Sequence, residues 1–196
     1  ENHAENYSKN QSTYYYKIRE TNPRNELDRV SRLIFLNKTC FNGLYRVNSK
    51  GKFNVPVGRY VNPNIVNKEN LFEVSKVLHS KDVSIKCQDF EDALKGVGHG
   101  DFVYLDPPYQ PVSSTASFTS YTESDFDFSD QKRLCAKFKA LDKKGVKVLL
   151  SNSKSDEIVK LFKEFSDGII EINANRFINS VSQKRTGHTE LLIKNY

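Results

Sequence analysis

The chain of 196 residues contains no methionine, no tryptophan and only three cysteines. Cys40, Cys87 and Cys135 form no C-x-x-C pair, which indicates reduced thiols of a cytoplasmic protein and excludes a disulfide framework. The longest apolar runs, such as Phe102–Leu105, are too short for a membrane span or a secretory signal core. Because the chain starts at Glu1 and lacks methionine, we expect it to be part of a longer polypeptide.

The chain is rich in aromatic residues, with 13 phenylalanines and 10 tyrosines. This content excludes a disordered chain and is sufficient for a sizeable core. The length is that of one domain, or of one domain with a modest insert. The four histidines have no metal-ligand spacing with cysteines or carboxylates, so no zinc site is predicted.

The net charge of +6 arises in one segment that contains no acidic residue. Between Ser31 and Asn64 there are six basic residues: Arg32, Lys38, Arg46, Lys50, Lys52 and Arg59. The rest of the chain carries 24 basic and 24 acidic residues and is neutral. A solvated lysine-rich loop would explain the charge alone, but the segment also holds interleaved arginine, asparagine and aromatic residues. These side chains are suited to reading and wedging bases, so the segment predicts a nucleic-acid interface.

Apolar spacing predicts helices over residues 12–20, 24–38, 68–79, 129–141 and 156–165, with Ser129 as a cap. Strands are predicted at Val83–Cys87, Phe102–Leu105, 146–150, 169–172 and 190–193. Strands that alternate with helices predict an α/β fold with a mostly parallel sheet. Residues 1–80 are expected to form a mostly helical target-recognition region, and residues 81–196 a catalytic region.

The motif that carries chemistry is Asp106-Pro107-Pro108-Tyr109, here called the tetrad. It directly follows the apolar run Phe102–Leu105. Ligands of open α/β sheets gather at the carboxyl ends of strands. The exocyclic amine of adenine is a poor nucleophile because its lone pair is delocalised into the ring. The Asp106 carboxylate and the Pro107 carbonyl could accept its two hydrogens and stabilise the charge that develops on nitrogen. The prolines stiffen the loop, and Tyr109 offers a face on which a flipped base can stack.

These motifs resemble the Dam-type DNA adenine methyltransferases over roughly residues 27 to 195. The similarity includes Asn42-Gly-Leu-Tyr-Arg46, the stretch from Phe53 to Tyr60, the segment Phe118–Tyr121 and Ser151-Asn152-Ser153 at the end of a strand. The resemblance implies a Rossmann-like sheet with a target-recognition insert, S-adenosylmethionine as the methyl donor, and adenine in double-stranded DNA as the acceptor, within GATC.

The resemblance also implies roles for individual residues. Phe41 would wedge into the duplex, and Asn42 would help to hold the space that adenine vacates. Leu44 and Pro56 would contact thymine, and Arg46 would read guanine. The weaker candidates for DNA contacts are Asn48, Asn54 and Arg59. Asp89 and Phe90 match the place where the family binds the adenine of the cofactor, and Asp106 also adjoins the cofactor.

Two family elements are missing from the sequence: the Lys-Trp-x-Gly-Gly-Lys motif and the Phe-x-Gly-x-Gly loop. By the resemblance, the first strands of the sheet and half of the cofactor site are therefore expected to lie outside this chain. The alternative is a catalytically incomplete DNA-binding fragment or subunit. A third hypothesis, methylation of glutamine in a protein or of structured RNA, fits the tetrad but leaves the basic segment unexplained.

Overall fold

The computed structural model describes residues 1–112, 126–174 and 188–196, which excludes the segment Phe118–Tyr121. The chain divides into two compact units, Glu1–Ile85 and Lys86–Tyr196, and each is described by itself. In the described ranges, no helix combines the length and the apolar character needed to cross a membrane.

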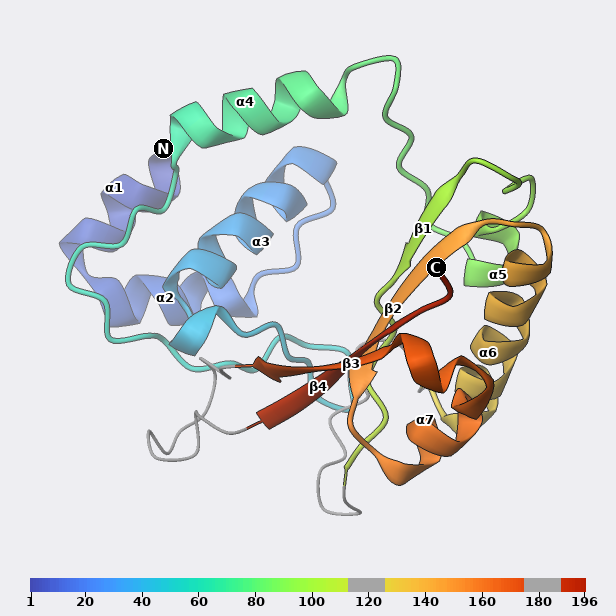
Figure 1. Ribbon diagram of the computed structural model, residues 1–196. Helices are drawn as coiled ribbons and strands as arrows, with labels where there is room; N and C mark the ends of the chain where they lie inside the picture. The colour runs from blue at the N-terminus through green and yellow to red at the C-terminus, as the bar shows by residue number, and fades with distance from the viewer. Residues whose placement is uncertain (113–125, 175–187) are drawn as a thin grey trace. The chain divides into compact units, whose positions relative to one another are not determined.

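The first unit is helical, with α1 (Asn2–Lys9), α2 (Gln11–Glu20), α3 (Glu26–Thr39), a short 3₁₀ turn η1 (Phe41–Gly43) and α4 (Lys68–Leu78) (Figure 1). The side chains of Asn10 and Asn25 accept hydrogen bonds from the first free amides of α2 and α3 and so fix where these helices begin. The core of the unit is largely aromatic and contains the buried side chains of Tyr7, Tyr15 and Phe35.

The second unit contains α5 (Phe90–Ala93), β1 (Phe102–Leu105), α6 (Phe128–Lys143), β2 (Lys147–Ser153), α7 (Asp156–Leu161), the 3₁₀ segment η2 (Lys163–Gly168), β3 (Ile169–Ala174) and β4 (His188–Lys194). The strand order is β1-β2-β4-β3. Figure 1 shows α5, α6 and α7 on one face of this sheet. Between helices and sheet lie fully buried side chains that include Phe138, Val148 and Leu150.

The expectation of a mostly parallel sheet is wrong. β1 pairs in parallel with β2, with Leu105 opposite Leu150, but β4 is antiparallel to both β2 and β3. The sheet is therefore mixed. Its one parallel pair still brings the carboxyl ends of β1 and β2 to the same edge, which is the arrangement that positions the site.

Two local predictions also need correction. Val83–Cys87 is not a strand: Ile85 is 73% exposed, and the segment pairs with no described strand. A short extended segment without a ladder partner has no means of stabilisation. The cap of α6 is Asp127 and not Ser129, because Asp127 accepts from the amides of Ser129 and Asp130 while the Asp130 carboxylate accepts from the Asp127 amide.

Candidate active site and nucleic-acid interface

Asp106 lies at the carboxyl end of β1, directly after Leu105, and its side chain is exposed. Ser151 on β2 donates a hydrogen bond from Oγ to Asp106 Oδ1 at 2.7 Å and accepts one from the Tyr104 hydroxyl at 3.2 Å. Among the described residues, no cation pairs with Asp106 and no donor reaches its Oδ2. The carboxylate is thus oriented through one oxygen, and the other oxygen is available to a ligand.

The two prolines of the tetrad differ in what their carbonyl groups bind. Gln131 of α6 donates from Nε2 to the Pro108 carbonyl oxygen at 2.9 Å. Within the described ranges, no donor reaches the carbonyl oxygen of Pro107. Since a carbonyl is a strong acceptor, the Pro107 oxygen can bind an external N–H group.

The loop after the prolines is fastened to the end of β2. The Gln110 amide donates to Asn152 Oδ1 at 3.1 Å, and the Ser153 hydroxyl donates to the Gln110 carbonyl. Asn152 Nδ2 in turn donates to Gln131 Oε1 at 3.0 Å, and both of these amide side chains are buried. Sequence reasoning treated the serines as strand-end polar residues and missed Gln131 altogether. The available signal was three successive polar residues at the end of an apolar strand.

Tyr109 is half-buried beside this network. Burial raises the pKa of its phenol above the ordinary value of 10, although the nearby Ser151 hydroxyl acts in the opposite direction. The ring is therefore neutral at physiological pH and presents an aromatic surface next to the Asp106 carboxylate.

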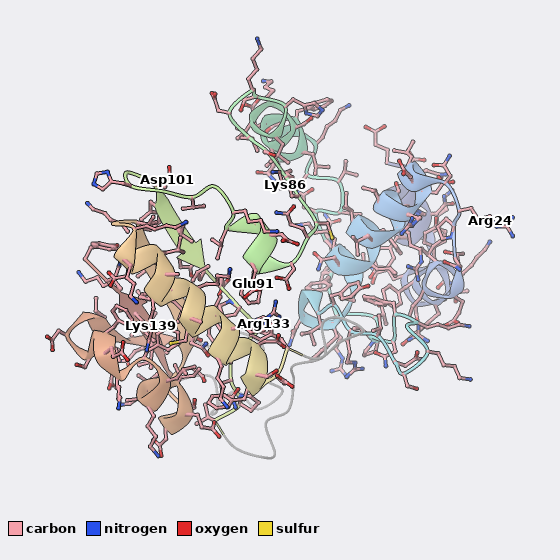
Figure 2. The ribbon with its side chains drawn as sticks, turned by 90° about the vertical axis from the view of Figure 1, so that its right-hand side faces the viewer. Arg24, Lys86, Glu91, Asp101, Arg133 and Lys139 are labelled. Atoms are coloured by element: carbon pink, nitrogen blue, oxygen red, sulfur yellow. The ribbon has the colours of Figure 1, made fainter. Side chains whose placement is uncertain are left out.

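Asp89 and Phe90 are held by Arg133 of α6, which Figure 2 shows beside Glu91. The Asp89 side chain caps α5 through the Glu91 amide, and both of its oxygens accept from Arg133 Nη2 at 3.1 Å. The amide of Glu91 and the guanidinium of Arg133 together hold the pKa of Asp89 below its ordinary value. The Arg133 guanidinium also lies 4.8 Å from the centre of the Phe90 ring. Asp89 and Phe90 are thus fixed in place at the start of a short helix.

The basic segment forms a loop that folds back on itself at the end of α3. Bridges join Cys40 to Val57 and Val47 to Phe53, and the Phe41 amide donates to the Pro56 carbonyl at 2.8 Å. The loop is anchored on α2, because the buried Tyr15 hydroxyl donates to the Val55 carbonyl at 2.8 Å. Burial raises the pKa of Tyr15 far above its ordinary value, so this donor is always protonated.

Asn42 has a left-handed backbone, with φ of 53°, and Gly43 follows with φ of 63°. Asn37 Nδ2 donates to the Gly43 carbonyl at 2.9 Å and holds this turn. Phe41 is 39% exposed and Pro56 is exposed, whereas Leu44 packs partly against the core. Asparagine adopts the left-handed region more readily than most other non-glycine residues, so the Asn42-Gly43 pair suits this turn.

Arg46 lies opposite Asn54 in this loop. Arg46 Nε donates to Asn54 Oδ1 at 2.8 Å, and Arg46 Nη2 donates to the Asn54 backbone carbonyl at 3.4 Å. Asn48 Oδ1 accepts from the amides of Lys50 and Lys52 and closes the turn. Two of the weaker candidates for DNA contacts, Asn48 and Asn54, therefore bind the loop itself with their side-chain oxygens.

A hollow of about 730 Å³ lies between the α2–α3 connection and this loop. Its lining includes five basic residues, Arg19, Arg29, Arg32, Lys50 and Lys52, and two acidic residues, Glu20 and Glu26. Arg32 is occupied by the carbonyls of Ile18 and Arg19 at the end of α2. The exposed Lys50, Lys52 and Arg59 carry charge on the surface of the same unit and suit phosphate groups.

The structure assigns the predicted residues to two groups. The second unit contains the four residues of the tetrad together with Asp89 and Phe90. In that unit, Phe90 packs against the same core cluster as Leu105. All eight predicted DNA contacts belong to the first unit, on η1 and the loop that follows it: Phe41, Asn42, Leu44, Arg46, Asn48, Asn54, Pro56 and Arg59.

Comparison with known proteins matches residues 1–178 to the family described as D12 class N6 adenine-specific DNA methyltransferase. The chain is 50% identical over 190 residues to the type II methyltransferase M.MjaIII of Methanocaldococcus jannaschii, covering 93% of the chain and 64% of that protein. It is 45% identical over 193 residues to the type II methyltransferase M1.LlaDCHI of Lactococcus lactis subsp. cremoris, covering 95% of the chain and 67% of that protein.

A third relative, the DNA adenine methylase of Serratia marcescens, is 38% identical over 146 residues, which cover 73% of the chain and 53% of that protein. The chain thus spans between about half and two thirds of the length of these curated relatives. The family match extends over most of the chain and includes the basic segment and the tetrad. By its sequence, the chain belongs to the D12 class of N6 adenine-specific DNA methyltransferases.

Proposed function

We propose that the protein transfers a methyl group from S-adenosylmethionine to the exocyclic amino nitrogen of adenine in double-stranded DNA, within GATC. The observation that carries the proposal is a pair of available acceptors at the end of β1. One is Asp106 Oδ2 and the other is the Pro107 carbonyl oxygen, and neither has a donor among the described residues. A primary aromatic amine has two N–H groups, which is the number that this pair can accept.

These two acceptors supply the chemistry that the amine needs. Accepting both hydrogens favours a tetrahedral nitrogen, whose lone pair then points away from the two acceptors. The Asp106 carboxylate also stabilises the positive charge that develops on nitrogen as the new N–C bond forms. Because these interactions strengthen in the transition state, they accelerate the chemical step itself. Adenine in a duplex cannot reach such a site and must be flipped out, to stack on Tyr109.

The residues present also fit a sulfonium cofactor on the side of Asp106. When bound, S-adenosylmethionine supplies an electrophilic methyl carbon on a positively charged sulfur. The Asp106 carboxylate and the neutral Tyr109 ring both tolerate a neighbouring cation. Asp89 and Phe90 are the proposed contacts for the adenine end of the cofactor, and Arg133 holds them in position.

The basic loop from Phe41 to Arg59, which we call the recognition loop, supports DNA as the substrate. We assign Phe41 to the gap left by adenine, together with the left-handed Asn42 beside it, and Arg46 to a guanine edge. In the same loop, we assign Leu44 and Pro56 to contacts with thymine. Lys50 contributes charge to the phosphate backbone without reading sequence.

The test is methyl incorporation into two duplexes that differ only in one GATC site, with labelled S-adenosylmethionine as donor. We expect label on the GATC duplex, and loss of the label when the adenine is replaced by a purine without its amino group. Equal incorporation into both duplexes would contradict specificity for GATC but would leave the proposed methyl transfer to adenine standing. Incorporation into protein or RNA alone would replace the proposed substrate.

Titration of the chain with S-adenosylmethionine by calorimetry separates catalysis from simple DNA binding. Clear binding of the donor supports the methyltransferase. A chain that binds GATC duplexes but shows no heat with the donor would instead be a catalytically incomplete DNA-binding fragment or subunit, and methyl transfer would then be tested on the complete protein.

A further inference from the structure

The loop that carries the tetrad, here called the catalytic loop, cannot hold itself in place through its own backbone. Proline has no N–H group, so Pro107 and Pro108 offer carbonyl acceptors and no donors. The first described backbone hydrogen bond that fastens the loop after them is donated by Gln110. Donors from outside the loop must therefore decide which of the two proline carbonyls is occupied and which is available.

A chain of two buried amide side chains supplies these contacts. It runs from the Gln110 amide to Asn152 Oδ1, from Asn152 Nδ2 to Gln131 Oε1, and from Gln131 Nε2 to the Pro108 carbonyl, at 3.1, 3.0 and 2.9 Å. Asn152 is fully buried and Gln131 is 1% exposed. The chain starts at a backbone donor and ends at a backbone acceptor. These ends fix the orientation of both amides, because a flip of either one would place two donors or two acceptors face to face.

We infer that Gln131 and Asn152 are positioning residues for methyl transfer. They bind the Pro108 carbonyl and the Gln110 amide on either side of Tyr109, and so keep the Pro107 carbonyl and the Asp106 carboxylate directed to the substrate. This inference rests on the proposed function, because it concerns the acceptors of the substrate amine. Neither residue belongs to the catalytic tetrad, and neither is expected to touch substrate or cofactor.

Three properties of the amide chain favour this role over a purely structural one. Its ends lie on the catalytic loop and not between two core elements. Its members come from two hydrogen-bonded elements, α6 and β2. Buried amides are expensive to leave unpaired, so a broken link is expected to displace the loop, whose described residues have no helix or strand hydrogen bonds of their own, and not α6 or β2.

The test replaces Gln131 by methionine, which has a similar length but lacks both amide functions. We expect kcat to fall by about 10- to 100-fold, the effect of misplacing reacting groups by an ångström or less. The KM for DNA is expected to stay within about twofold, because the predicted DNA contacts lie on another unit. Gln131→Glu, which keeps the acceptor for Asn152 but loses the donor for Pro108, is expected to lower kcat similarly.

A second readout does not depend on activity. Hydrogen exchange of the Gln110 amide, measured by NMR, is expected to accelerate about tenfold or more in Gln131→Met. The Val148 amide, on β2, is the internal control. Like the Gln110 amide, it donates to the side-chain oxygen of an asparagine, Asn195, at 2.7 Å. Leu134→Ala is the control variant: it removes a buried side chain of α6 and is expected to lower the melting temperature, but it leaves every donor and acceptor of the amide chain in place.

The outcomes separate this inference from the proposed function. Normal kcat in Gln131→Met, with or without faster exchange at Gln110, would overturn the positioning role and leave methyl transfer intact. An equal loss of kcat in Leu134→Ala under folding conditions would overturn it as well. If the complete protein transfers no methyl group while Gln110 responds as expected, the proposed function fails, although the amide chain still holds the loop.

Discussion

Replacing Arg46 by alanine is expected to reduce discrimination at a single base pair of the target. The guanidinium has five N–H groups, of which Asn54 binds Nε–H at 2.8 Å and one N–H of Nη2 at 3.4 Å. Three N–H groups remain, on Nη1 and Nη2, which are enough for the two acceptors on a guanine edge. A bidentate contact of this kind contributes about 1–3 kcal/mol of discrimination. This range corresponds to roughly 5- to 150-fold in relative affinity.

The assay measures binding to the GATC duplex and to duplexes in which each base pair of the site is replaced, one position at a time. All measurements use one fixed salt concentration. For Arg46→Ala, we expect the preference at one position to collapse while preferences at the other positions persist. Asn54→Ala is expected to produce part of this effect, because the guanidinium loses the acceptor that orients it. Lys50→Ala is the matched control: it is expected to weaken all duplexes alike and to flatten the salt dependence.

A uniform loss of affinity in Arg46→Ala, similar to that of Lys50→Ala, would refute the assignment of Arg46 to base reading. It would leave Arg46 as a phosphate contact. A normal preference at every position in Arg46→Ala would remove the residue from the interface altogether.

Further predictions concern the tetrad, the core and the thiols. Asp106→Ala is expected to abolish methyl transfer with little change in DNA binding, because Asp106 lies outside the recognition loop; transfer at a normal rate would contradict its catalytic role. Phe138→Ala is expected to lower the free energy of unfolding by about 3–5 kcal/mol in denaturant titration, since this side chain is fully buried; a loss below about 1 kcal/mol would contradict this. Burial raises the pKa of Cys40 to about 11, so at pH 8 iodoacetamide is expected to modify the exposed Cys87 and spare Cys40, as judged by mass spectrometry. Faster modification of Cys40 would refute its burial.

Most of the longer helices and four of the five predicted strands could be predicted from the sequence because their signals are local, whereas α1 was missed and the helix predicted over residues 156–165 ends at Leu161. Apolar spacing located α3, α4 and α6 to within a few residues of their observed bounds. The direction of β4 was not predicted, because the alternation of strands with helices favoured parallel pairing and the residues of so short a strand constrain its direction only weakly. The segment Val83–Cys87 failed for the related reason that a strand depends on a partner, which local composition does not reveal.

The position of the tetrad at the end of β1 could also be predicted, since an apolar run followed by an acid is a local pattern. The residues that hold the tetrad could not. Gln131 lies 23 residues after Pro108, and Asn152 lies 42 residues after Gln110. Each is an ordinary amide in the sequence and acquires its role only when α6 and β2 pack against the loop.

The recognition loop shows the same limit at shorter range. The resemblance makes Arg46 and, more weakly, Asn48 and Asn54 candidates for DNA contacts, and each side chain can read a base or bind a phosphate. The pairing of Val47 with Phe53 gives them different surroundings, since it places Asn54 opposite Arg46 and leaves Asn48 at the turn. Asn48 Oδ1 accepts from two backbone amides and has both lone pairs in use, whereas the described donor to Asn54 Oδ1 is Arg46 Nε, which leaves it a second lone pair. Register therefore gives similar side chains different partners within the loop, which residue types alone do not reveal.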